Sequence, residues 1–94
     1  MQVRWTTRAA QDLEEITNYI LKDSATSAET VARKLFDVAN SLDSLPNRGR
    51  PGRMPGTREL VISSLPFVIV NQVDSEAVEI LPIHHGARNW TEEG

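Results

Sequence analysis

The sequence predicts a single α+β domain in which a helical hairpin packs on one face of an antiparallel sheet. Three observations support this prediction. A short alternating segment opens the chain, two amphipathic helical patterns follow it, and three strand-like segments at hairpin spacing come last. A chain of 94 residues suffices for one small domain and leaves no room for a second. The expected element order over residues 1–94 is therefore β-α-α-β-β-β.

A strand and a helix are expected first. Residues 2–5 alternate polar and apolar side chains, which predicts a short strand. Thr6 and Thr7 follow as candidates for the helix N-cap, because a hydroxyl at that position accepts a hydrogen bond from an unpaired backbone N–H. Between residues 8 and 22 the large apolar residues recur every three or four positions, which predicts a helix with one buried face.

The second helix has the clearest pattern in the chain. Its large apolar residues recur at spacings of four, three, four and three from Val31 to Leu45. Ser27 is the expected N-cap, and Pro46 is expected to end the helix. Since only a short polar link separates the two helices, we expect them to form an antiparallel hairpin that lies on the sheet.

The C-terminal half predicts the rest of the sheet. Strands are expected at residues 58–62, 67–73 and 77–84, and the turns between them predict an antiparallel meander. Residues 47–57 are rich in Gly and Pro and predict an ordered loop inside the domain. Pro82 lies within the last strand. Because it has no N–H to donate, it is expected at a bulge or with that position facing outward.

Composition narrows the function classes. The chain has no cysteine, which excludes disulfides, thiolate metal sites and cysteine catalysis. No apolar run is long enough to span a bilayer, and the first residues lack the apolar segment of a signal peptide, so we expect a cytoplasmic protein. The formal net charge of −3 argues against a surface that grips nucleic acid throughout. Two adjacent histidines without placed carboxylates do not make a metal site, and no cofactor is expected.

The charge is distributed unevenly along the chain. The segment 47–58 contains no acid and four arginines, namely Arg48, Arg50, Arg53 and Arg58. A basic loop on an acidic body can hold an anion or an acidic partner segment. Arg58 is the best single candidate for anion binding because it follows the Gly-rich loop, and Arg50 and Arg53 are further candidate contacts to an anion or a target. The alternatives are a solvated loop for the other arginines and an ordinary strand-edge charge for Arg58, which precedes Glu59.

A second candidate region spans residues 80–90, close to the C-terminus. An apolar strand delivers His84, His85 and Arg88 to its exposed end, which we expect to lie near Arg58 if the meander forms. Since successive strand residues point to opposite faces, at most one histidine should face a given cleft. A strand-end histidine with an ordinary hydrogen bond and an Arg88 paired with a nearby acid are the alternatives. Trp90 either anchors the tail or contacts a partner.

Short motifs in a fixed order extend over nearly the whole chain. They include Val3-Arg4-Trp5-Thr6, Leu45-Pro46 with Gly49-Arg50, Pro55-Gly56-Thr57-Arg58-Glu59-Leu60-Val61, Pro66-Phe67-Val68-Ile69-Val70 and His85-Gly86-Ala87-Arg88. In this order and spacing the chain resembles the RelE/ParE superfamily of type II toxin–antitoxin toxins. The resemblance implies a small toxin that is neutralised by a cognate antitoxin, whose C-terminal segment wraps it. It also implies that the complex binds promoter DNA only through the antitoxin.

The resemblance implies one of two targets. RelE-like members cut mRNA on the ribosome, whereas ParE-like members inhibit DNA gyrase. If the chain is a nuclease, Arg58, His85 and Arg88 are its candidate catalytic residues, since the reaction needs a group near neutral pKa and arginines on phosphate. RelE-like nucleases typically carry clustered lysines and a late tyrosine or histidine. Here the lysines are Lys22 and Lys34, the one tyrosine lies in the first helix, and the chain is acidic, which favours the ParE branch.

A third hypothesis is a small homodimeric interaction module without toxic activity. The sequence does not decide between a homodimer and a toxin–antitoxin heterotetramer, nor does it identify the antitoxin. Expression of the chain alone, compared with expression beside the neighbouring open reading frame, separates the toxin hypotheses from this third one.

Overall fold

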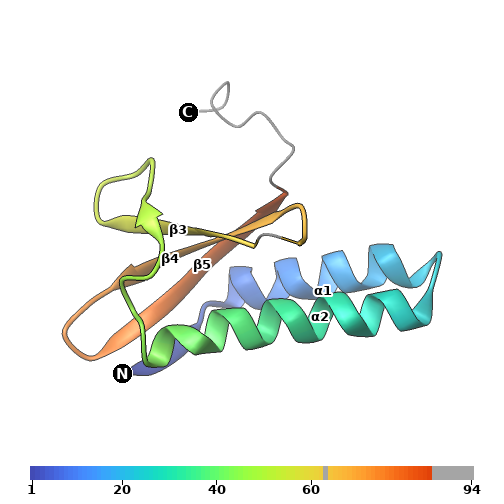
Figure 1. Ribbon diagram of the computed structural model, residues 1–94, viewed down its shortest axis with the longest axis horizontal. Helices are drawn as coiled ribbons and strands as arrows, with labels where there is room; N and C mark the ends of the chain where they lie inside the picture. The colour runs from blue at the N-terminus through green and yellow to red at the C-terminus, as the bar shows by residue number, and fades with distance from the viewer. Residues whose placement is uncertain (63, 86–94) are drawn as a thin grey trace.

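A hairpin of two helices covers one face of a five-stranded sheet in the described part of the chain (Figure 1). The computed structural model describes residues 1–62 and 64–85, except for the side chain of His85. The elements in chain order are β1 (Gln2–Trp5), α1 (Thr7–Leu21), α2 (Ala25–Asn40), the 3-10 turn η1 (Ser41–Asp43), β2 (Arg50–Pro51), β3 (Thr57–Val61), β4 (Phe67–Val73) and β5 (Ala77–His85).

The predicted α+β fold is confirmed, and the sheet adds two features to it. The strands lie in the order β1-β5-β4-β3-β2, with β3, β4 and β5 forming the expected antiparallel meander. The first added feature is that β1 pairs with β5 in the parallel direction, so the sheet is mixed rather than wholly antiparallel. The second is the two-residue strand β2, which pairs with β3 inside the segment predicted to be a loop.

Both helices begin at a hydroxyl cap. Thr6 caps α1 as predicted, because its Oγ1 accepts from the backbone N–H of Ala9 at 3.2 Å. The cap of α2 is Ser24, whose Oγ accepts from the backbone N–H of Ser27 at 3.1 Å. The prediction of Ser27 as the cap is therefore wrong. Ser27 supplies the donor, and the helix begins three residues earlier than its large apolar residues indicate.

The second helix also ends earlier than predicted. The chain leaves the α-helix after Asn40 and makes the turn η1, so Pro46 does not end the helix. The Ser41 hydroxyl donates to the Val38 carbonyl oxygen at 2.6 Å, a local bond that competes with regular helical pairing. Leu42 is fully buried from within η1, whereas Leu45 is 58% exposed. The regular apolar spacing therefore extends to Leu45 by coincidence, because Leu45 lies beyond the end of the helix and outside the core.

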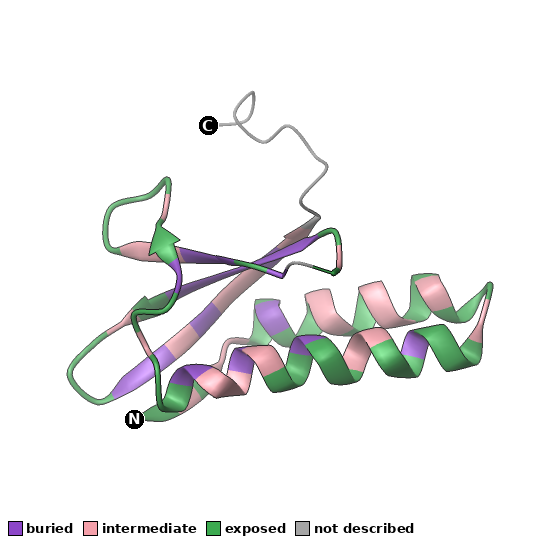
Figure 2. Cartoon of the chain, viewed as in Figure 1, coloured by how far each residue is buried: buried purple, intermediate pink, exposed green. Residues whose placement is uncertain are grey.

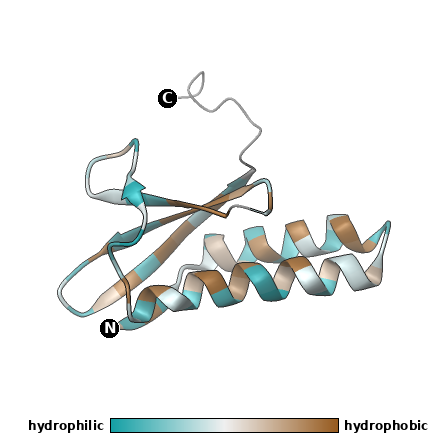
Figure 3. Ribbon diagram, in the orientation of Figure 1, coloured by the Kyte–Doolittle hydropathy of each residue, from teal (hydrophilic) through white to brown (hydrophobic). Residues whose placement is uncertain are grey.

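The core lies between the sheet and the helical hairpin. Figure 2 shows buried residues on β3, β4 and β5 and exposed residues on the outer faces of the helices and at most turns. Figure 3 shows hydrophobic residues over much of β3, β4 and β5, and bands of hydrophobic and hydrophilic residues alternating along both helices. Small residues of the helices allow close approach to the sheet. The completely buried apolar residues in this core are Ala9, Leu35, Ala39, Leu42, Ile69, Val78 and Ile80.

A bulge interrupts the pairing of β4 with β5. The register shifts between Ile69 and Asn71, and Pro82 lies on the facing part of β5. The prediction that Pro82 occupies a bulge is confirmed, since a proline cannot donate to the ladder. The next backbone N–H, that of Ile83, donates to Asp12 Oδ2 of α1 at 3.1 Å. Helix α1 therefore supports the strand where its own pairing is broken.

Candidate functional site

The arginine-rich segment folds around a buried acid. Arg50 donates from Nε and Nη2 to Glu59 Oε1 at 3.3 and 3.2 Å. The backbone N–H of Arg53 donates to the other oxygen, Glu59 Oε2, at 3.1 Å. Glu59 is only 8% exposed, so its charge is held by these donors rather than by water. One carboxylate therefore neutralises Arg50 and fastens β2 and the following loop to β3.

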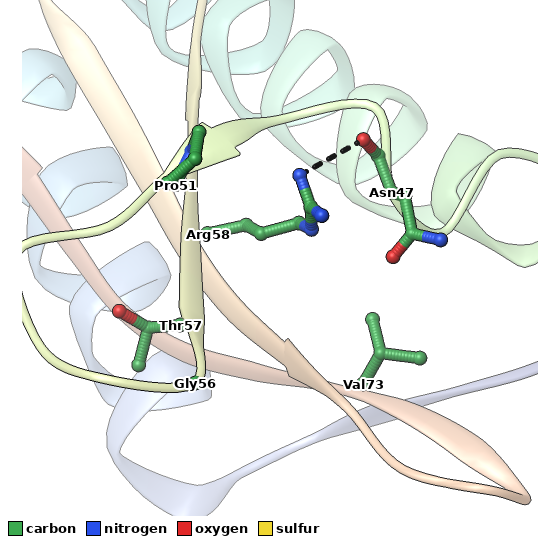
Figure 4. A pocket seen from close by; sticks show the side chains of 6 residues that line it. All are labelled: Asn47, Pro51, Gly56, Thr57, Arg58 and Val73. Atoms are coloured by element: carbon green, nitrogen blue, oxygen red, sulfur yellow. Dashed lines mark hydrogen bonds between the residues drawn. The ribbon is translucent and has the colours of Figure 1, made fainter.

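Arg58 fastens the same hairpin from its other face. Its Nη1 donates to the carbonyl oxygens of Gly49 at 2.8 Å and Asn47 at 3.3 Å, the second of which is drawn in Figure 4. Gly49 must be small here, because a Cβ at this position would lie 2.9 Å from the backbone oxygen of Glu59. The close approach of the loop to β3 brings both carbonyls within reach of the guanidinium.

A cavity of about 300 Å³ lies beside the Arg58 guanidinium. Figure 4 shows its lining, which combines polar groups with the apolar side chains of Pro51 and Val73. Gly56 closes the hairpin below it with a φ of +81°, a conformation that glycine adopts without strain. The described residues that line this cavity, called the Arg58 pocket below, are Asn47, Pro51, Gly56, Thr57, Arg58 and Val73.

The structure places the candidate arginines of the loop in one hairpin but not on one face. Arg50 pairs in register with Glu59, and Arg58 pairs with Pro51. Because neighbouring residues of a strand point to opposite faces, Arg50 shares the face of Glu59 while Arg58 lies on the other. Arg53 follows in the loop between β2 and β3. An anion or partner that contacts Arg58 therefore approaches a different face from one that contacts Arg50.

A larger groove of about 830 Å³ separates α1 from the ends of β4 and β5. Its lining combines apolar side chains with charged ones, and among the latter Arg8 Nε lies 3.1 Å from Asp12 Oδ1. Tyr19, on α1, is 71% exposed although it lines the groove. Such an exposed aromatic beside an apolar groove is typical of a contact surface for another protein. The residues that matter below are Asp12, Ile16, Tyr19, Phe67, Ile83 and His84.

The C-terminal candidates are only partly described. His84 is half-buried and lines the groove. His85 is the last residue of β5, and its side chain lies outside the described atoms, as do Arg88 and Trp90 entirely. The backbone register nevertheless separates His85 from Arg58, because His85 pairs with Phe67 of β4 whereas Arg58 pairs with Asn71.

That separation is large for a shared active site. Four strand residues correspond to about 13 Å along the sheet, and β4 itself lies between the two backbones. The expectation that the end of the last strand lies near Arg58 is not met for His85. His84 lines the groove and the backbone of His85 ends β5 at the same end of the sheet, whereas Arg58 lies toward the opposite end.

Sequence reasoning missed Glu59 and Asp12 as site-forming residues. Glu59 was interpreted only as a neighbour of Arg58, although an acid directly after an arginine in a strand, opposite another arginine-rich stretch, is a signal for such a pair. Asn71 is fully buried, and within the described residues neither its amide nitrogen nor its oxygen has a hydrogen-bond partner. Asn71 and Gln72 together interrupt the apolar run of β4, so the sequence pattern alone does not indicate that Asn71 is buried.

One carboxyl outside these surfaces has a shifted pKa. The backbone N–H groups of Glu76 and Ala77 donate to Asp74 Oδ1, each at 2.8 Å, and lower the pKa of that carboxyl below 3.8. Asp74 lies in the turn between β4 and β5, so it orders the turn rather than a binding surface. In residues 1–62 and 64–85, no three His, Cys, Asp or Glu side chains gather to hold a metal ion, and no helix there is long and apolar enough to cross a membrane.

Comparison with known proteins gives matches over nearly the whole chain. Residues 3–90 match the family model of the ParE toxin of the type II toxin–antitoxin system parDE. Toxin RelE2 of Caulobacter vibrioides is 41% identical over 87 residues, which are 93% of this chain and 97% of that protein.

Two solved structures are similar in fold. The chromosomal ParDE TA system from P. aeruginosa has a TM-score of 0.83 at 28% identity, covering 90% of this chain and 95% of that one. The toxin–antitoxin complex RelBE2 from Mycobacterium tuberculosis has a TM-score of 0.66 at 26% identity, covering 93% and 92%. The backbone is thus similar to both kinds of toxin structure, with the higher score for the first.

Proposed function

Because the chain belongs to the RelE/ParE superfamily of type II toxin–antitoxin toxins and matches the ParE toxin model over residues 3–90, we propose that it arrests growth by binding DNA gyrase. The observation that carries this proposal is the TM-score of 0.83 to the ParDE structure, against 0.66 to the RelBE2 structure. A gyrase inhibitor acts by binding and needs no assembled catalytic group.

The distribution of charged groups supports the same branch. A nuclease needs an acid or base and a phosphate clamp within reach of one scissile bond. The register keeps Arg58 and His85 at opposite ends of β4, and Arg50 is already paired with Glu59. Lys22 caps the end of α1 and Lys34 lies within α2, so neither adds to the basic loop. A net charge of −3 also suits a protein target better than an RNA surface.

A supercoiling assay tests the proposal. The purified chain is incubated with gyrase, ATP and relaxed plasmid, and we expect supercoiling to fall with increasing toxin and to return when the cognate antitoxin is added. A chain carrying Arg33→Lys, on the outer side of α2, is the control and should inhibit as the parent does. Supercoiling that stays unchanged at a large molar excess of a toxin that stops growth in cells would reject gyrase as the target.

The alternative is a ribosome-dependent mRNA endonuclease. It is favoured by the 41% identity to the protein called toxin RelE2 and by a histidine that lines the groove. Primer extension on translated mRNA after induction distinguishes the two functions. Cleavage that disappears in His84→Ala, His85→Ala or Arg58→Ala, with the variants folded, would support the nuclease, whereas intact mRNA during growth arrest supports the gyrase inhibitor.

The groove beside α1 is the surface we assign to the antitoxin. The two similar solved structures are a toxin–antitoxin system and a toxin–antitoxin complex, and Ile16, Tyr19 and Phe67 offer apolar contacts for a partner segment. Binding at 100 times Kd stabilises the folded toxin by about 2.7 kcal/mol. The melting temperature should therefore rise with antitoxin and should rise less for Tyr19→Asp. Leu45→Asp is the matched control, because Leu45 is 58% exposed and does not line the groove.

A further inference from the structure

The guanidinium of Arg58 has two different edges. Nη1 is held by two backbone carbonyls, at 2.8 and 3.3 Å, which fixes the plane of the group. Nε and Nη2 form the other edge, whose N–H bonds are parallel, and neither has an acceptor within residues 1–62 and 64–85. Parallel donors of this kind match the two oxygens of a carboxylate. We propose that the Arg58 pocket binds a carboxylate side chain of an acidic protein partner through this open edge.

The same hairpin already contains such a pair. Arg50 uses its Nε and Nη2 edge on Glu59, at 3.3 and 3.2 Å. The Glu59 carboxylate accepts from Arg50 on one face of the hairpin. The pairing of β2 with β3 keeps this carboxylate away from Arg58, which lies on the other face. Of the two arginines Arg50 and Arg58, only Arg58 has its Nε and Nη2 edge open to a pocket.

The walls of the pocket favour a carboxylate on a short aliphatic stem. Pro51 and Val73 supply the apolar part of the lining, and Figure 4 labels them together with Arg58. Asn47 adds a side-chain amide that can donate to a second oxygen. A volume of about 300 Å³ accommodates one acidic side chain and is small for a larger ligand. An Asp or Glu residue can place its methylene groups on the apolar wall and its oxygens on Arg58.

Nucleic acid fits this pocket less well than an acidic protein segment. Binding of a phosphate backbone draws its affinity from several cations along one track. Here Arg50 is neutralised by Glu59 and lies on the opposite face, and the whole chain carries a net charge of −3. One open guanidinium edge with an apolar wall is suited to a single carboxylate. The proposal concerns this pocket alone and does not depend on which target the toxin inhibits.

Nuclear magnetic resonance of the arginine Nε–H groups tests the proposal on the purified full chain. Propionate, formate and inorganic phosphate are the probes, titrated separately at constant ionic strength. We expect propionate to shift the Arg58 Nε–H signal saturably, with the Arg50 signal unmoved because its acceptor is Glu59. Arg58→Lys should weaken propionate binding about tenfold, since the bidentate contact is lost. Arg33→Lys, a like substitution on α2, should leave the affinity unchanged.

A second variant keeps Arg58 intact. Val73→Ala removes part of the apolar wall, so the preference for propionate over formate should fall while formate binding stays the same. Shifts that are linear in concentration and equal at Arg50 and Arg58 would overturn the proposal, as would an unaltered propionate preference in Val73→Ala. Tighter binding of phosphate than of propionate would overturn the assignment to a carboxylate and indicate a nucleotide or RNA ligand. Because this readout needs no gyrase, a failed supercoiling assay leaves the result standing.

Discussion

Replacing Glu59 by alanine should destabilise the domain, because Glu59 anchors the arginine-rich hairpin. The substitution removes the acceptor of two bonds from Arg50 and one from the Arg53 backbone N–H. A hydrogen bond to a charged group contributes about 1.5–3 kcal/mol to the free energy of unfolding. The Arg50 side chain is 61% exposed, so water replaces much of its share, and about 1 kcal/mol remains for that pair. Together with the bond from the Arg53 N–H we expect a loss of about 2.5–4 kcal/mol.

Urea and thermal unfolding followed by circular dichroism measure this loss. For a domain of this size, a loss of about 2.5–4 kcal/mol lowers the melting temperature by about 10–30 °C. Glu59→Gln keeps the shape and one acceptor oxygen, so it should lose about half as much. Glu29→Ala is the control, because the Glu29 side chain is 76% exposed on α2 and its contact with Arg33 is 3.8 Å long. A Glu59→Ala protein that unfolds within about 0.5 kcal/mol of the parent would refute the assignment of Glu59 as the anchor of the hairpin.

Three further outcomes follow from local geometry. Gly49→Ala should destabilise the domain by about 1–3 kcal/mol in urea unfolding, because its Cβ would meet the Glu59 backbone oxygen at 2.9 Å; an unchanged midpoint would contradict this. Asp12→Ala leaves the part-buried Ile83 N–H without its acceptor and should cost about 1–3 kcal/mol, with faster amide exchange at Ile83 as the specific readout. Asp74 has a lowered pKa, so its contribution is present above pH 3.8 and disappears as the pH falls through the folded-state value. The stability difference between the parent and Asp74→Asn should therefore close in acid, and a difference that persists there would exclude a charge effect.

Local patterns predicted most of the fold because the forces that form these elements are local or depend on side-chain periodicity. The strand over residues 67–73 and the bulge at Pro82 follow from apolar content and from a missing donor. The cap of α2 was misplaced because the first turn, after Ser24, contains only small residues that carry no apolar period. The parallel pairing of β1 with β5 depends on how the hairpin of helices returns the chain to the sheet, which no local pattern records.

The candidate site was harder to predict than the fold. The sequence identified the arginines as candidate anion-binding residues, but the role of each depends on which face of the hairpin it occupies. Strand β2, which sets those faces, was not predicted. Without β2 there is no register to set Arg50 opposite Glu59 or to turn Arg58 to the other face. The expected proximity of His85 to Arg58 was wrong for a different reason: strand direction alternates in an antiparallel meander, so the start of β3 lies at the same end of the sheet as the start of β5, whereas His85 ends β5.

The two surfaces of this toxin lie at opposite ends of the central strand. Phe67 begins β4 and lines the groove, whereas Val73 ends β4 and lines the Arg58 pocket. Six strand residues correspond to about 20 Å, so no single side chain of a partner reaches both surfaces. A partner segment that covers both must extend along the sheet for about six residues or more, with apolar contacts at one end and an acidic residue at the other. A segment that fills only the groove leaves Arg58 accessible. An antitoxin of that kind binds the toxin without covering the Arg58 pocket, so its binding to the toxin and its neutralisation of the toxin can be measured separately.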